Sequence, residues 1–187
     1  MPRETSNRTI YVIDYVPEWP EHFAQLRERI WPSVSDFAIG IEHVGSTSVP
    51  GLAAKPVIDI DIVVASRQGI PLAVKRLANL GYTHVGDLGI CDREAFDLPS
   101  PDLAHNLYVC PSESQALRNH LALRDHLRAH AMDVAAYSAL KKELARRFPH
   151  DIASYIEGKS DFILSVLARR GLSPDSLDSI RRANAQS

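Results

Sequence analysis

The chain has few cysteines, no long apolar run and no excess of positive charge. Its two cysteines, Cys91 and Cys110, lie far apart, so neither a disulfide framework nor a zinc site with paired ligands is expected. No run of about 18 apolar residues appears, and the N-terminal residues lack the apolar segment of a signal peptide. We therefore expect a cytoplasmic protein with reduced thiols and no membrane partner.

Charge and size narrow the class of partner further. The 21 Lys and Arg residues are matched by 23 Asp and Glu residues, giving a formal charge of −2. Proteins that bind duplexes or tRNA generally carry a positive surface, so nucleic acid is not the favoured partner and a small molecule fits better. With 187 residues, 45% of them hydrophobic, and no linker, we predict a single domain over residues 1–187. Residues 9–112 would form its α/β core and residues 113–185 its helical part.

The run from Val57 to Val64 is short and rich in β-branched residues, and it predicts a buried strand. Side chains alternate between the two faces of a strand, so Asp59 and Asp61 share one face while isoleucines fill the other. Two neighbouring carboxylates repel each other unless a cation compensates, and hard oxygen ligands suit Mg²⁺ or Mn²⁺. The alternative is an edge strand whose acids face solvent.

A polar loop precedes this strand. Gly45, Ser46 and Thr47 combine a residue that permits close backbone approach with two hydroxyl donors, which suits a phosphate, and Lys55 follows in the same loop. Twelve residues, 47–58, separate Ser46 from Asp59. Taken alone, Gly45-Ser46 could be an ordinary turn. Together with the two aspartates it predicts a site for a metal and a phosphate.

The remaining elements are expected in the order strands and helices first, helices alone last. Residues 9–14 read as a short strand or lead-in, and the apolar spacing after Pro17 predicts an amphipathic helix that ends at Pro32 and the Gly40 region. Further predicted elements are a strand at 39–44, a helix at 66–80, and strands at 82–85, 95–98 and 106–110, with helices from about Ser114 onward. This order predicts an α+β fold with a mixed sheet and a C-terminal helical lobe.

The spacing of Gly-Ser and Asp-x-Asp resembles that of the nucleotidyltransferase superfamily of the polymerase-beta type. The segment HVGSTSVPGLAAKPVIDI resembles the signature of the GrpB family, a family whose activity is not defined and which is also found appended to some dephospho-CoA kinases. The similarity extends over about residues 9–170 and includes YVPEW at 15–19 with Phe23, LRDHLR at 123–128, and Tyr137, KKELA at 141–145, Tyr155 and Lys159.

The resemblance implies a metal-binding, nucleotide-binding site. Asp59 and Asp61 would hold Mg²⁺ or Mn²⁺ and act in catalysis, while Gly45, Ser46, Thr47 and Lys55 would contact the nucleotide. Arg124 and Lys159 lie in segments that resemble family motifs and are expected to bind its phosphates. The other cations of the helical part are expected on solvated helix faces: Arg118, Arg128, Lys141 and Lys142. Three histidines without an evident carboxylate partner, His120, His126 and His130, are expected at the surface.

One strand departs from the family pattern. Where such proteins commonly carry His-His-Leu-His, this chain has His105, Asn106, Leu107 and Tyr108. By parity Asn106 and Tyr108 share one face and His105 lies on the other, so these three residues form a possible additional site, or else are ordinary sheet-surface residues. Tyrosine is a poor substitute for imidazole near neutral pH because its pKa is about 10.

The superfamily pattern also includes a third carboxylate from a later strand. The candidates are Asp92, Glu94, Asp97 and Asp102, and none is favoured over the others.

These patterns predict a metal-dependent enzyme that transfers a nucleoside monophosphate from an NTP, with ATP expected, to a small-molecule acceptor. A carboxylate acceptor would yield an activated acyl adenylate. The alternative is a catalytically silent nucleotide- or metabolite-binding or regulatory module of the same fold, and a weaker third hypothesis is a metal-dependent nucleotide hydrolase. The sequence leaves the acceptor and the oligomeric state open.

Overall fold

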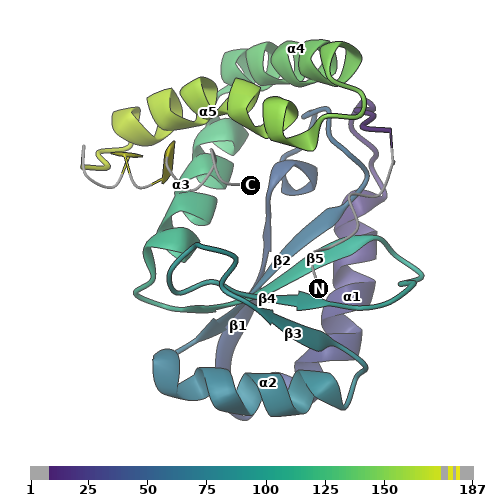
Figure 1. The fold of residues 1–187 in the computed structure, drawn as a ribbon, viewed down its shortest axis with the longest axis vertical. Coiled ribbons are helices and arrows are strands. Elements are labelled where there is room, and N and C mark those ends of the chain that lie inside the picture. Colours follow the sequence, from purple (N-terminus) through teal and green to yellow (C-terminus); the bar gives the residue numbers. More distant parts are fainter. Residues whose placement is uncertain (1–8, 174–176, 179, 182–187) are drawn as a thin grey trace.

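The computed structural model describes residues 9–173, 177–178 and 180–181. A mixed five-stranded sheet forms its centre, in the order β1-β2-β5-β4-β3 (Figure 1). The strands are β1 (Ala38–Val44), β2 (Ile58–Val64), β3 (Thr83–Gly86), β4 (Glu94–Asp97) and β5 (His105–Pro111). Strands β2 and β5 pair in parallel, and the other neighbours pair antiparallel.

Helices cover the sheet and extend beyond it. They are α1 (Trp19–Val34), α2 (Ile70–Ala78), α3 (Gln115–Ala129), α4 (Ala131–Arg147) and α5 (Ile152–Arg169), with short 3₁₀ turns η1 (Ser46–Ser48) and η2 (Arg67–Gly69). In Figure 1, α4 and α5 lie together at one end of the molecule and α2 lies at the opposite end. The predicted α+β class, with a mixed sheet, an N-terminal helix and C-terminal helices, is confirmed.

The main core lies between α1, α2 and one face of the sheet. The isoleucines of β2 point into it, as the alternation in the sequence predicts, and pack with Leu26, Ile30 and Leu77. The opposite face of β2 carries Asp59, Asp61 and Val63, and Val63 packs with Cys110 and with Leu117 of α3. This second face is therefore the one on which the acidic residues meet the helical part.

One local expectation differs from the structure. Pro32 does not end the first helix, which continues to Val34, although a proline in a helix interior removes a backbone hydrogen bond. Val34 is buried in the main core, so tertiary packing favours the added residues of the helix. Residues 9–14 were expected to form a short strand or a lead-in, and they form a lead-in with a single bridge between Ile13 and Ala54.

Candidate functional site

Gly45 brings the backbone against the carboxylate of Asp59. It follows β1 with φ +68° and ψ −170°, a conformation that essentially only glycine adopts. A Cβ at this position would collide with the Asp59 carboxylate. The following turn η1 is held by Ser48, whose Oγ donates a hydrogen bond to the Gly45 carbonyl over 2.6 Å. Glycine is therefore required both by the backbone angles and by the proximity of the acid.

Asp59 and Asp61 stand on the same face of β2 but have different surroundings. Asp59 is partly exposed, and its Oδ1 accepts a hydrogen bond from Asn106 Nδ2 over 2.8 Å. Burial raises the pKa of Asp59, against the lowering effects of the Asn106 hydrogen bond and the nearby charges of His120 and Lys55. Asp61 is fully buried and its Oδ2 lies 2.7 Å from His120 Nδ1, whereas its Oδ1 has no hydrogen-bond partner in the described chain.

His120 reaches this pair from α3. Burial lowers the pKa of His120, but the charge and hydrogen bond of Asp61 outweigh burial, and the net shift is upward from 6.5. The imidazole and the Asp61 carboxylate therefore stabilise each other as an ion pair. His120 was expected at the surface without a carboxylate partner, and this expectation is wrong. His126 also has one, because its Nε2 lies 2.6 Å from Asp133 Oδ2.

Lysines gather on the other side of the Gly45-Ser46 turn. Lys141 is only 2% exposed, and its Nζ donates a hydrogen bond to Ser46 Oγ over 2.8 Å while lying 4.5 Å from the centre of the Tyr137 ring. Burial and the charge of Lys159 lower the pKa of Lys141 to about 7. Lys141 was expected on a solvated helix face, which is wrong for this residue, whereas the adjacent Lys142 is exposed.

Lys159 and Lys55 complete the lysine group. Lys159 Nζ lies 4.4 Å from the centre of the Tyr155 ring, and Lys55 Nζ lies 5.7 Å from the same centre. Burial and the charge of Lys55 lower the pKa of Lys159 to about 8. None of these lysines forms an ion pair with an acidic side chain in the described part of the chain, although the charge of Asp59 acts on both Lys141 and Lys159.

Two arginines join α3 to the turn. Arg124 donates hydrogen bonds to Glu42 and Asp125, each over 2.7 Å, and to the carbonyl of His43. Arg128 donates two hydrogen bonds to the carbonyl of Ser48, over 2.8 and 3.0 Å. These contacts fix the position of the turn relative to the helices and keep a guanidinium beside it.

A cavity of about 190 Å³ lies where these groups converge. Its walls are formed by Gly45, Ser46, Asp59, His120, Leu123, Arg124, Leu127, Tyr137 and Lys159. Five of these were singled out from the sequence: Gly45, Ser46, Asp59, Arg124 and Lys159. Two cationic side chains, the hydroxyl of Ser46 and the carboxylate of Asp59 thus surround one cavity. Such a set of groups can accommodate an anion and a cation side by side.

The other predicted residues lie outside the cavity wall. Thr47 is buried; its hydroxyl donates to the Val57 carbonyl over 3.3 Å and lies 3.0 Å from His43 Nε2. Burial and the charges of Arg128 and Arg124 lower the pKa of His43 to about 4. Because the Thr47 hydroxyl gives its proton to the Val57 carbonyl, it accepts from the Nε2 of the neutral imidazole. The ammonium group of Lys55 lies over the Tyr155 ring. Asp61 contacts His120, and of these two residues only His120 lines the cavity.

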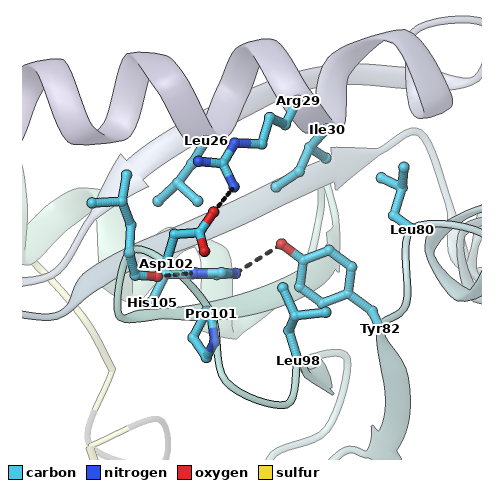
Figure 2. Close-up of a pocket in the computed structure, with 10 residues that line it drawn as sticks. Leu26, Arg29, Ile30, Leu80, Tyr82, Leu98, Pro101, Asp102 and His105 are labelled. Carbon is cyan, nitrogen blue, oxygen red and sulfur yellow. Dashed lines mark hydrogen bonds and ion pairs between the residues drawn. The ribbon is translucent and has the colours of Figure 1, made fainter.

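His105 lies on the opposite face of the sheet from Asn106 and Tyr108. It lines a separate cavity of about 120 Å³ beneath α1 (Figure 2), where its Nδ1 donates to the Leu103 carbonyl and its Nε2 accepts from the Tyr82 hydroxyl, each over 2.7 Å. Figure 2 also shows Asp102 bound to Arg29 at this cavity. His105 is therefore not part of the site around Asp59.

None of the four candidates for a third carboxylate lines the cavity at Asp59. Asp92 pairs with Arg67, Glu94 with His84, and Asp102 with Arg29, while Asp97 is exposed on β4. The residues of β5 that stand beside the two aspartates are Asn106, opposite Asp59, and Tyr108, opposite Asp61. A neutral amide and a phenol thus occupy the neighbouring positions.

The acidic pair fits part of the coordination shell of a hard divalent cation. The described residues contain no group of three or more His, Cys, Asp or Glu side chains that could hold an ion. The buried and unpartnered Oδ1 of Asp61 is nevertheless an oxygen that a cation would satisfy, and Mg²⁺ commonly takes only one or two carboxylates together with water and phosphate oxygens. Asp59 and Asp61 therefore fit Mg²⁺ or Mn²⁺ when a phosphate ligand supplies the rest.

The fold agrees with the comparisons to known proteins. The model of the GrpB protein family matches residues 9–169, and the chain belongs to this family. It is 36% identical to the UPF0157 protein YqkA of Bacillus subtilis over 83% of this chain and 46% of that one, so it spans about half the length of that relative. It is 38% identical to the UPF0157 protein PA4798 of Pseudomonas aeruginosa over 86% of this chain and 67% of that one.

A solved structure shares the fold. The crystal structure of the conserved protein GrpB from Enterococcus faecalis superposes with a TM-score of 0.76 at 29% identity, covering 91% of this chain and 99% of that one. Within the described residues, no helix is both long and apolar enough to cross a bilayer.

Proposed function

We propose that this protein is a divalent-metal-dependent nucleotidyltransferase-like enzyme that moves a nucleoside monophosphate from an NTP, with ATP expected, to a small-molecule acceptor. The observation that carries the proposal is the buried Lys141, whose Nζ contacts Ser46 with no acidic side chain paired to it among the described residues. Burying an unpaired charge is unfavourable, so such a lysine indicates an anionic ligand.

The surroundings of Ser46 suit a triphosphate. Lys159 and Arg124 line the same cavity as Ser46, and backbone N–H groups of the η1 turn lie beside it. Asp59, on the other side of Gly45, would hold the cation that phosphoryl transfer requires, together with Asp61. When bound, that ion neutralises charge on the phosphates and on the leaving pyrophosphate.

The residues of the chain then have distinct tasks. Lys141, Lys159 and Arg124 bind and orient the phosphates, and Gly45 allows the backbone to approach the Asp59 side of the site. His120 holds Asp61 in place through the 2.7 Å contact. Most of the rate enhancement in phosphoryl transfer comes from such positioning and from charge stabilisation.

One observation favours the alternative of a silent binding module. Asn106 donates a hydrogen bond to Asp59 Oδ1 and so occupies a carboxylate oxygen, and no third acid lies beside the pair on β5. A module of this kind would bind nucleotide without turnover. Formation of pyrophosphate from ATP separates the two functions, because binding alone releases none.

Calorimetric titration with ATP, ADP and AMP tests whether the site binds the phosphates of a nucleotide. Because the cations are gathered at Ser46, affinity should increase with the number of phosphates, by about tenfold or more from AMP to ATP. Equal affinity for the three nucleotides, or no binding of any of them, would contradict the proposed function.

A further inference from the structure

Two buried polar side-chain atoms have no hydrogen-bond partner in the described chain, and both belong to residues next to Tyr108. One is Asp61 Oδ1 and the other is Arg93 Nε. Tyr108 of β5 stands opposite Asp61 in the strand register, and the Arg93 guanidinium lies over the Tyr108 ring with Cζ 4.5 Å from its centre. Tyr108 in turn faces His120, with ring centres 6.2 Å apart. Arg93 therefore adjoins the acidic side of the site.

The backbone N–H of Arg93 donates to the Ile90 carbonyl, but its guanidinium forms no ion pair or hydrogen bond with any residue that the structure describes, whereas the nearby Arg67 is paired with Asp92. A guanidinium carries five N–H donors and stays charged at any physiological pH. The Tyr108 ring satisfies its charge only in part, and a partly buried donor without an acceptor is unfavourable. The guanidinium therefore lacks an anionic partner among residues 9–173, 177–178 and 180–181, and a bound anion would provide one.

The chemistry of the neighbouring strand restricts that anion. Nucleotidyl transfer to a hydroxyl requires a group that removes the hydroxyl proton, and the β5 positions beside Asp59 and Asp61 are Asn106 and Tyr108 rather than acids. A carboxylate is already ionised near neutral pH and attacks phosphorus without a base. Its two oxygens also match the planar fork of a guanidinium.

We propose that the acceptor is a carboxylic acid and that Arg93, stacked on Tyr108, binds its carboxylate. This inference rests on the proposed function and names the substrate class of the same site. In the reaction, a carboxylate oxygen forms a bond to the α-phosphorus of the NTP while the bond from that phosphorus to the oxygen bridging to the β-phosphorus breaks. Pyrophosphate leaves with the electron pair, the product is an acyl nucleotide, and no proton is transferred.

Saturation-transfer NMR with matched pairs of small molecules tests the subsite directly. The probes are propionate and propanol, succinate and butanediol, and benzoate and benzyl alcohol, each added to the protein with Mg²⁺ and the non-hydrolysable α,β-methylene analogue of ATP, and also without nucleotide. The wild type should bind at least one carboxylate and reject its alcohol. Arg93→Gln should weaken that carboxylate about tenfold or more, and Arg93→Lys, which keeps the charge without the fork, should weaken it less.

Arg118→Gln is the matched control, because Arg118 is an exposed arginine of α3 that is paired with Glu113, and it should leave carboxylate binding unchanged. Circular dichroism and the affinity for the ATP analogue establish that each variant folds. Binding of no carboxylate, equal binding of the alcohols, or unchanged binding in Arg93→Gln would overturn the inference. If the wild type does not bind the ATP analogue, the proposed function is contradicted instead. The samples without nucleotide would then still test whether Arg93 binds a carboxylate.

Discussion

Lys141 of α4 and Ser46 of the η1 turn are 95 residues apart in the sequence, yet Lys141 Nζ donates a 2.8 Å hydrogen bond to Ser46 Oγ. The contact joins the helical part of the chain to the glycine-serine loop of the sheet. It also places an amino group that is only 2% exposed beside Ser46, which lines the cavity at Asp59. In the proposed function, a bound anion would offset the unfavourable burial of this lysine.

Replacing Lys141 should have opposite effects on the stability of the free protein and on ATP binding. Lys141→Met retains most of the side-chain volume and removes the buried charge, so the free protein should become more stable by about 1–3 kcal/mol. The same variant should bind ATP about tenfold more weakly or worse, because a charge-assisted contact is lost. Thermal unfolding and calorimetry measure the two effects. Lys142→Met, at the exposed neighbouring position, should change neither, and lower stability of Lys141→Met would contradict this account.

Nucleotide binding should be linked to proton uptake. At pH 8 the free protein holds Lys141, with its pKa of about 7, mostly neutral. A bound phosphate favours the charged form and raises this pKa, so binding takes up a proton at pH 8, and uptake vanishes toward pH 6 where the lysine is already charged. Titrations in two buffers of different ionisation enthalpy measure the effect. Proton release at pH 8, or uptake that persists in full in Lys141→Met, would show that Lys141 is not the group involved.

The sequence predicted those parts of the site that depend on local residue patterns. Alternation within residues 57–64 placed Asp59 and Asp61 on one face, and the glycine-serine pair before them marked the loop that the structure brings against Asp59. The order of the strands along the chain could also be predicted, because their apolar runs are short and bounded by turns. Residue type and position were enough to assign each side chain to a face of the strand, because this alternation is a local property.

Contacts supplied by the helices could not be predicted in this way. Lys141 and His120 lie on helices whose other faces are polar, and the side that meets the sheet depends on how α3 and α4 pack. A signal for Lys141 was available in hindsight, since it lies four residues after Tyr137 and shares its buried side. No comparable signal identified Arg93, whose place is set by the register of β4 and β5.

Gly45 should tolerate no side chain. Gly45→Ala would set a Cβ into the Asp59 carboxylate and require backbone angles that alanine disfavours, so we expect a loss of about 3 kcal/mol or more in unfolding free energy. Gly89→Ala is the control, because Gly89 also has positive φ but its Cβ would meet open space; it should lose only about 1 kcal/mol. Chemical denaturation measures both, and equal losses would mean that the contact with Asp59 is unimportant.

The contact between His120 and Asp61 should make stability depend on pH. Because the folded protein raises the pKa of His120 above 6.5, its contribution is fully present below pH 6.5 and is lost as the pH rises through the folded-state value. Wild type should therefore exceed His120→Gln by about 1–3 kcal/mol at pH 5.5 and by less at pH 9. Denaturation of both proteins across this range measures the difference, with the exposed His150→Gln as control. A difference that grows with pH would reverse the assigned sign.

In the proposed complex, ATP lies beside Asp59 and Asp61 with a divalent ion between them. The deciding experiment is a calorimetric titration of ATP into the wild type and into the Asp59→Asn/Asp61→Asn double variant, each with and without Mg²⁺. Mg²⁺ should strengthen ATP binding to the wild type and have no effect on the double variant, whose amides are poorer ligands for the ion. The same dependence on Mg²⁺ in both proteins, or no ATP binding by the wild type, would show that the two aspartates do not hold the ion at the nucleotide.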